Sequence, residues 1–336
     1  MRVYVALGLL STALVALGAS ALRAKDAPVL TKTFVDRINQ LNGGMWKAVY
    51  NGKMQNITFS EAKRLTGAWI QKNSSLPPVR FTEEQLRTEL PESFDSAEKW
   101  PNCPTIREIA DQSACRASWA VSTASAISDR YCTVGGGKQL RISAAHLLSC
   151  CKQCGGGCKG GFPGFAWRYY VEYGIASSYC QPYPFPQCEH QGAQGNKTPC
   201  SNYKFVTPQC NTTCTDKTIP LIKYRGKDAY MLLPGEEEFK RELYFNGPFV
   251  AILFVYTDLF AYKSGVYRNV DGSYMGVTAV KVVGWGKLNG TPYWKVANTW
   301  DTDWGMDGYL LILRGNNECN IEHLGFAGTP DTSQLT

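Results

Sequence analysis

The sequence predicts an α+β protein made of two subdomains with a cleft between them. Of its 336 residues, 44% are apolar, which is enough to build a sizeable core. Helical periodicity dominates the middle of the chain, whereas short strands separated by glycine-rich turns dominate the C-terminal part. Helices followed by strands are typical of α+β architectures, and a cleft is expected where the two parts meet.

Three helices are predicted in the middle of the chain. The first begins at Ser118, because Trp119 and further large residues recur every four positions after it. A second is expected after Ser143 and a third over 165–173. Residues 174–215 contain several prolines and glycines and five cysteines, so we expect a loop that is ordered only if it is bridged.

The C-terminal part is predicted to be a short helix followed by strands. The helix opens at the acidic run 236–238, because acidic side chains are favoured at the positive end of a helix. The expected strands cover 249–255, 280–283, 294–297 and 309–313.

The first 21 residues have the layout of a cleavable secretory signal. Residues 3–17 form one apolar run behind Arg2 and end near small residues. An uncleaved signal anchor is the alternative, although the run is short for a membrane span.

Residues 22–89 form a basic stretch that is interpreted as a propeptide. They hold eleven Lys and Arg against six Asp and Glu, whereas the whole chain carries +7, so the remainder is nearly neutral. That distribution excludes a nucleic-acid-binding surface on the main domain. A helix start at Thr82 and the breaker Pro77-Pro78 favour a small helical segment joined by a cleavable loop.

Thirteen cysteines, all between Cys103 and Cys319, predict disulfides, because a secretory compartment oxidises thiols. The alternative is a metal cluster in the run CCKQCGGGC at 150–158. The odd number leaves at least one thiol unpaired within the chain. Five glycosylation sequons are compatible with passage through the secretory pathway: Asn56, Asn73, Asn196, Asn211 and Asn289.

Five stretches resemble the papain family of cysteine proteases, and within it cathepsin B. They are LPESFD (90–95), DQSACRASW (111–119), CKGGFPGFAW (158–167), CEHQ (188–191) and VVGWGKLNGTPYWKVANTWDTDWG (282–305). The resemblance implies a papain-like domain over 90–336, with a helical subdomain, a β-rich subdomain and an N-terminal helical prosegment. It also implies an occluding loop at about 185–201.

The resemblance assigns four catalytic positions, of which two are changed. In the family a Cys thiolate attacks the peptide carbonyl, a His acts as base, an Asn orients that His, and a Gln helps to form the oxyanion hole. These positions hold Ser118, Thr278, Asn298 and Gln112 here. A serine hydroxyl needs a general base as it attacks, and a threonine is no base at neutral pH. Proteolysis is therefore expected to be undetectable or nearly so.

The walls of the implied groove differ as well. Arg116 replaces a glycine, and we expect it to plug the primary pocket or to charge it positively. Val277 replaces another glycine, and Leu324 stands where cathepsin B keeps a Glu that favours basic side chains. The docking edge Gly160-Gly161 is retained, although a tight turn is the alternative interpretation.

The remaining implied positions concern the occluding loop and the core. His190 is expected to latch the loop to Asp111, whereas Gln191 replaces the second His and removes recognition of a substrate's C-terminal carboxylate. The other histidines, His146 and His323, are expected to serve packing. If the site is inactive, a purely structural role in the core is the favoured interpretation of Trp300, Trp304 and Asn298.

The resemblance also implies six disulfides and leaves Cys319 over. The pairs are Cys103 with Cys132, Cys115 with Cys158, Cys150 with Cys210, Cys151 with Cys154, Cys180 with Cys214, and Cys188 with Cys200.

The favoured function is that of a pseudopeptidase that binds peptide or protein ligands without cutting them. A weak peptidase that uses Ser118, and a decoy that binds cystatin-type inhibitors, are the alternatives. No cofactor, metal or nucleic acid is expected, and no membrane contact once the signal is removed. We expect a monomer that passes through the secretory pathway to a lysosomal or extracellular location.

Overall fold

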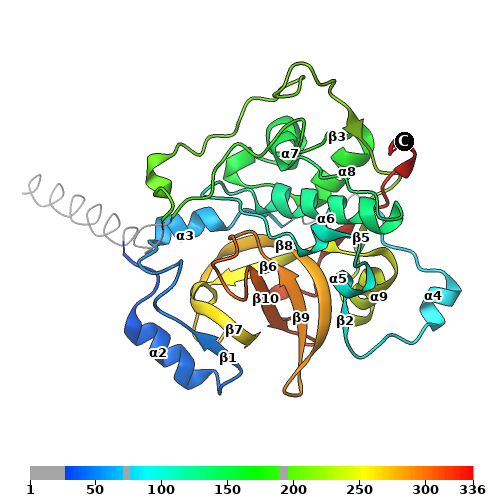
Figure 1. Ribbon diagram of the computed structural model, residues 1–336. Coiled ribbons are helices and arrows are strands. Elements are labelled where there is room, and N and C mark those ends of the chain that lie inside the picture. The colour runs from blue at the N-terminus through cyan, green and yellow to red at the C-terminus, as the bar shows by residue number, and fades with distance from the viewer. Residues whose placement is uncertain (1–26, 71–75, 190–195, 336) are drawn as a thin grey trace, which may run out of the picture.

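The computed structural model describes residues 27–70, 76–189 and 196–335. The predicted signal at 1–21 lies outside these ranges. Figure 1 shows a group of helices above a large, strongly curved sheet. This arrangement confirms the predicted α+β class with one helical and one β-rich part. Within the described ranges, no helix is both long enough and apolar enough to cross a membrane.

The helical part is built around α6 (Ser118–Val134), which is buried almost throughout. It begins at the predicted residue. The second helix, α7 (Ala144–Cys150), is capped by Ser143. The Ser143 hydroxyl accepts a hydrogen bond from the backbone N–H of His146 at 3.0 Å. The third, α8 (Pro163–Tyr173), starts two residues before the predicted range, because proline is well tolerated in a first helical turn.

The β-rich part is a nine-stranded sheet, in which the eight strands of its main path run in the order β1-β7-β10-β9-β8-β6-β11-β5. All of its pairings are antiparallel except that of β7 with β10. Its strands are β1 (Trp46–Ala48), β2 (Phe94–Asp95), β5 (Tyr230–Leu232), β6 (Phe249–Tyr256), β7 (Tyr262–Tyr267), β8 (Tyr274–Leu288), β9 (Thr291–Ala297), β10 (Tyr309–Leu313) and β11 (Gly325–Ala327).

The strand predicted at 280–283 is much longer in the structure, where it spans β8. Its glycines suggested a turn at Gly284, but the strand continues through a register shift between Val282 and Gly284. A Cβ on Gly284 would lie 2.6 Å from the carbonyl oxygen of Phe94. The glycine is therefore required by the close approach of β2, and does not end the strand.

The N-terminal segment, which we define as residues 27–89, is more than the predicted helical piece. Its strand β1 pairs with β7, and Trp46 packs against Tyr267 with ring centroids 5.0 Å apart. Figure 1 shows α2 and β1 along the side of the sheet next to β7. Its helices are α2 (Lys32–Leu41), α3 (Phe59–Leu65) and α4 (Glu83–Arg87).

The helix predicted to start at Thr82 is confirmed, and its cap explains why. The Thr82 hydroxyl accepts from the N–H of Gln85 at 3.2 Å, and the Gln85 side chain accepts from the N–H of Thr82 at 2.9 Å. Thr58 and Glu61 form the same capping box at the start of α3.

Short elements complete the fold. The remaining helices and strands are α5 (Ser96–Lys99), α9 (Glu236–Asn246), β3 (Ile175–Ala176) and β4 (Lys223–Tyr224). The 3-10 turns are Pro104–Arg107, Lys152–Cys154, Gly157–Lys159, Cys200–Asn202, Thr257–Ala261, Glu318–Asn320 and Thr332–Gln334.

Six disulfides join the same pairs that the resemblance implies. They are Cys103–Cys132, Cys115–Cys158, Cys150–Cys210, Cys151–Cys154, Cys180–Cys214 and Cys188–Cys200. The four sulfurs of the run 150–158 are all in these bonds, so the metal-cluster alternative is wrong. Cys319 is free and buried. The stretch 174–215 is fixed by three of these bonds and contains little regular structure of its own.

Candidate functional site

The first residue of α6 lies at the junction of the two parts. Ser118 is fully buried, and its hydroxyl oxygen accepts a hydrogen bond from the backbone N–H of Ala279 on β8 at 3.2 Å. This is the only hydrogen bond of that hydroxyl among the described residues. Within the described ranges, the hydroxyl therefore faces a backbone donor and no side-chain base.

The residue next to Ala279 on β8 is Thr278, which is also fully buried. In the part of the chain that the structure describes, its hydroxyl has no hydrogen-bond partner, and neither does the side-chain NH₂ group of Asn298. The Asn298 side-chain oxygen accepts only from the N–H of Thr299, at 2.9 Å. Thr278 and Asn298, which the resemblance places in the same catalytic site, therefore each have one buried polar group without a described partner. Such unpaired buried groups are uncommon in proteins.

The Gln112 side chain is fully engaged. Its NH₂ group donates to the carbonyl oxygen of Cys115 at 2.9 Å and to that of Arg64 at 3.1 Å, and its oxygen accepts from the Thr299 hydroxyl at 2.7 Å. Arg64 belongs to the N-terminal segment. The Gln112 NH₂ group, which the resemblance assigns to the oxyanion hole, is therefore already bonded to a carbonyl of the N-terminal segment.

The N-terminal segment crosses the junction as an extended chain. The N–H groups of Gly67 and Ala68 donate to the carbonyl of Val277, at 2.8 and 3.1 Å. On the other side, the N–H of Gly161 donates to the Gly67 carbonyl at 3.0 Å, and the N–H of Trp69 donates to the Gly161 carbonyl at 2.8 Å. Strand-like bonds to both parts hold the segment in the cleft.

Two glycines make this close approach possible. A Cβ on Gly67 would lie 2.6 Å from the carbonyl carbon of Arg116, and one on Gly160 would lie 2.4 Å from the indole nitrogen of Trp69. Gly160 also has a φ of 114°, a conformation that favours glycine. The pair Gly160-Gly161 therefore acts as a docking edge for the segment, and not only as a tight turn.

The side chain of Arg116 points at the N-terminal segment. It is half-buried, and its guanidinium donates to the Thr66 hydroxyl at 3.3 Å. Burial lowers the pKa of this guanidinium. Val277 and Leu324 are buried in the same apolar cluster as Leu76 of the segment.

Trp300 covers the end of the cleft from the β-rich part. Its indole N–H donates to the carbonyl of Leu65 at 3.0 Å, and its ring stacks on Phe260 with centroids 5.1 Å apart. Trp304 meets it edge-on at 4.8 Å. The tryptophan thus serves both the core and the contact with the N-terminal segment.

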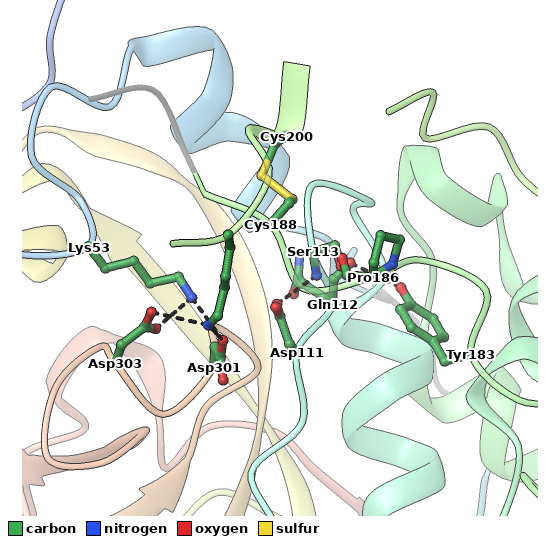
Figure 2. The surroundings of a disulfide bond; sticks show 11 residues. Lys53, Asp111, Gln112, Ser113, Tyr183, Pro186, Cys188, Cys200, Asp301 and Asp303 are labelled. Atoms are coloured by element: carbon green, nitrogen blue, oxygen red, sulfur yellow. Dashed lines mark hydrogen bonds and ion pairs between the residues drawn. A yellow bond between two sulfur atoms is a disulfide. The ribbon is translucent and has the colours of Figure 1, made fainter. Parts of the chain in front are cut away.

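A cluster of charged side chains links the N-terminal segment to the loop that carries Asp301 and Asp303. The sequence analysis did not predict this cluster. The Lys53 ammonium lies 2.6 Å from Asp303 and 3.3 Å from Asp301, and Lys197 contacts both carboxylates as well. Figure 2 shows Lys53 reaching across to these two carboxylates. Burial opposes ionisation of Asp301, but the bond from Lys197 and the charge of Lys53 hold its pKa below the ordinary value. Lys53 and Asp301 are 248 positions apart, so no local pattern indicates the pair.

Asp111 lies next to this cluster (Figure 2). One of its oxygens accepts from the N–H of Ser113 at 2.7 Å, and the other has no hydrogen-bond partner among the residues that the structure describes. Burial raises the pKa of Asp111 to about 6, against the attraction of Lys53. The predicted partner of Asp111, His190, lies outside the described residues, and so does Gln191.

Replacing Asp111 by Asn is expected to stabilise the protein above pH 6. The folded-state pKa lies above the ordinary value of 3.8, so this group favours folding less as the pH rises from about 4 to about 6. Asparagine has no proton to lose and keeps the oxygen that Ser113 bonds. The gain above pH 6 is up to about 3 kcal/mol and vanishes near pH 4. Denaturant unfolding at both pH values measures it, and a variant less stable than the parent at neutral pH would contradict it.

Neither histidine within the described residues serves the junction. His146 is buried on α7, where burial lowers its pKa to about 4, so the imidazole is neutral. His323 is exposed near the C-terminus. Neither forms a hydrogen bond to Ser118 within the part of the chain that the structure describes.

The model of the papain family of cysteine proteases matches residues 90–329, and the chain belongs to this family. Within it the chain is cathepsin B-like. It is 44% identical over 319 residues to cathepsin B-like cysteine proteinase 6 of Caenorhabditis elegans, covering 90% of this chain and 84% of that one. It is 40% identical over 314 residues to a cathepsin B-like cysteine proteinase of Schistosoma japonicum, covering 89% of this chain and 90% of the relative.

A solved structure extends the similarity to the N-terminal segment. The structure of proCathepsin B S9 from Trypanosoma congolense is 86% identical and superposes with a TM-score of 0.86, covering 91% of this chain and 100% of that one. The papain-like fold expected from the sequence is therefore confirmed.

Proposed function

We propose that this cathepsin B-like protein is a pseudopeptidase: it binds extended peptide or protein ligands in its cleft and does not cut them. The observation that carries the proposal is the surroundings of Ser118, whose hydroxyl accepts from a backbone N–H and has no base within hydrogen-bond reach among the described residues. An alcohol that cannot lose its proton during attack is a poor nucleophile. In this proposal Ser118 occupies the nucleophile position and Thr278 the position of the base.

The unpaired groups of Thr278 and Asn298 support this assignment. In the proposal, Asn298 is the residue that would orient an imidazole at position 278. With the short Thr278 side chain in place of that imidazole, the Thr278 hydroxyl and the Asn298 NH₂ group have no partner among the described residues. Gln112, the proposed oxyanion donor, keeps an NH₂ group that already binds one peptide carbonyl, that of Arg64.

The backbone bonds of Val277 and Gly161 support an extended peptide as the ligand. Both residues present strand-like groups to a chain in the cleft, and main-chain bonds of this kind accept many sequences. In the described structure the N-terminal segment takes this place, so we propose that it is a prosegment whose displacement opens the cleft to peptides, proteins or cystatin-type inhibitors. Six disulfides support passage through the secretory pathway to a lysosomal or extracellular site.

Replacing Ser118 by Ala is expected to change no hydrolytic rate. The chain is cut between Glu89 and Leu90, and the parent and variant are incubated with fluorogenic dipeptide substrates from about pH 4 to about pH 8, because acid-base catalysis depends on pH. A fluorophosphonate probe tests the same hydroxyl. Turnover that disappears in the Ser118→Ala variant, or labelling of Ser118, would instead establish the weak peptidase.

A further inference from the structure

We propose that the cleft selects ligands that carry a carboxylate side chain at the position now filled by Thr66, and that Arg116 recognises this carboxylate. The ligand class is thus an acidic peptide or protein segment. This inference rests on the proposed function, because it specifies which peptides the cleft would hold once the N-terminal segment is displaced.

The first observation is that the charge of Arg116 is not neutralised. Arg116 forms no ion pair within the described ranges, and its half-buried side chain makes a single long hydrogen bond, to the Thr66 hydroxyl at 3.3 Å. Its Nε atom is buried and has no hydrogen-bond partner among the described residues. A partly buried cation without a counter-charge costs free energy, and burial accordingly lowers its pKa.

The second observation is that the group facing Arg116 is a poor match for it. The Thr66 hydroxyl uses its own proton to bond the carbonyl of Lys63 at 2.8 Å, so toward Arg116 it offers only a neutral acceptor. A guanidinium presents several N–H donors in a planar fork, which fits the two oxygens of a carboxylate. Such charge-assisted bonds are about twice as strong as neutral ones.

The third observation is that position 66 is enclosed. The Thr66 side chain is 1% exposed, and a Cβ on Gly276 would lie 3.1 Å from it. The glycine leaves room for a side chain at position 66, and the Arg116 guanidinium lies 3.3 Å from the hydroxyl of the side chain that fills it. The Val277 side chain beside the segment is apolar and offers no group that would compete for the guanidinium. A side chain seated there meets Arg116 largely out of water, where a charge pair is stronger than at the surface.

The N-terminal segment itself serves as the tethered ligand in the test, so the full chain is used. Thr66→Asp and Thr66→Asn have nearly the same shape and differ in charge. Each is made in the parent and in an Arg116→Gln chain, which completes a double-mutant cycle. The measurement is hydrogen exchange of the amides of Gly67 and Ala68, whose bonds to Val277 report how firmly the segment is held.

With Arg116 present, these amides are expected to exchange at least about tenfold more slowly in Thr66→Asp than in Thr66→Asn, because a bond to a charged group is the stronger one. In the Arg116→Gln chain the advantage of Asp is expected to vanish or reverse. Loss of the Thr66 bond to Lys63 affects both backgrounds equally, so the cycle cancels it.

An equal Asp-to-Asn ratio in the two backgrounds would overturn the inference. So would a Thr66→Asp chain that fails to fold in the parent background while Thr66→Asn folds, since the carboxylate would then be disfavoured beside Arg116. Neither result bears on hydrolysis. Conversely, Ser118-dependent turnover would overturn the proposed function and leave this coupling unchanged.

Discussion

Replacing Ser118 by Cys and Thr278 by His in one chain is expected to create turnover of fluorogenic dipeptide substrates at least about 10³-fold above either single variant. The chain is cut between Glu89 and Leu90 in every case. The two changes act together because the nucleophile and the base work as a unit, so that restoring one of them alone recovers little.

The described geometry favours this result. Position 118 is the first residue of α6, where the helix dipole lowers the pKa of a thiol, and position 278 lies one residue from the backbone N–H that bonds the Ser118 hydroxyl. The side-chain NH₂ group of Asn298 is unpaired among the described residues, while its oxygen accepts from the N–H of Thr299. The larger side chain at the fully buried position 278 costs about 1 to 3 kcal/mol of stability through overpacking.

The matched control combines Ser118→Cys with Thr278→Gln, which adds bulk without a base. Thermal unfolding checks that all variants are folded. Equal turnover by Thr278→His alone would contradict the argument, because the hydroxyl would then need no thiol in its place. The Ser118→Cys, Thr278→His variant could also be folded but inactive. If adding Arg116→Gly then makes it active, Arg116 obstructs the access of substrates to the cleft.

Replacing Arg130 by Met is expected to lower the free energy of unfolding by about 3 to 5 kcal/mol, because it leaves a buried carboxylate without its cation. Arg130 on α6 pairs with Glu242 on α9, and the two side chains are 1% and 0% exposed. The guanidinium also donates to the carbonyl of Pro248 at 2.7 Å and to the carbonyls of Gly247 and Gly328, each at 3.1 Å. These bonds link α6 to α9 and to backbone of the β-rich part, so the loss weakens the contact between the two parts.

Denaturant unfolding followed by tryptophan fluorescence, with the disulfides intact, measures this change. The control is Arg130→Met combined with Glu242→Leu, which removes both charges and is expected to recover most of the loss. A double variant as unstable as the single one would show that the backbone carbonyl bonds, and not the unpaired Glu242, cause the effect.

Local sequence predicted those elements whose signals are close together along the chain. The start of α6 at Ser118 and the cap of α4 at Thr82 rest on residues within a few positions of each other. The strand β8 was underestimated because Gly284 has the same sequence signature whether it ends a strand or admits the backbone of Phe94. Only the packed neighbour distinguishes the two cases.

Long-range contacts were beyond local reasoning. Lys53 and Arg130 occur in polar surroundings in the sequence, where a charged residue is ordinarily solvated, yet both are buried against carboxylates more than 100 positions away. The strand β1 is only three residues long, and its pairing with β7 depends on the arrival of a segment more than 200 positions later in the chain.

The sequence by itself determined the family, the papain-like fold and the residue types at positions 118 and 278. These follow from the order of the residues and from motifs whose members are close together in the sequence. The tertiary structure alone decided what those residues face: a backbone N–H at Ser118, the Thr66 hydroxyl at Arg116 and a peptide carbonyl at Gln112. The physical reason is that hydrogen bonds and charge pairs act over a few ångströms, and folding brings within that range groups that the chain keeps far apart.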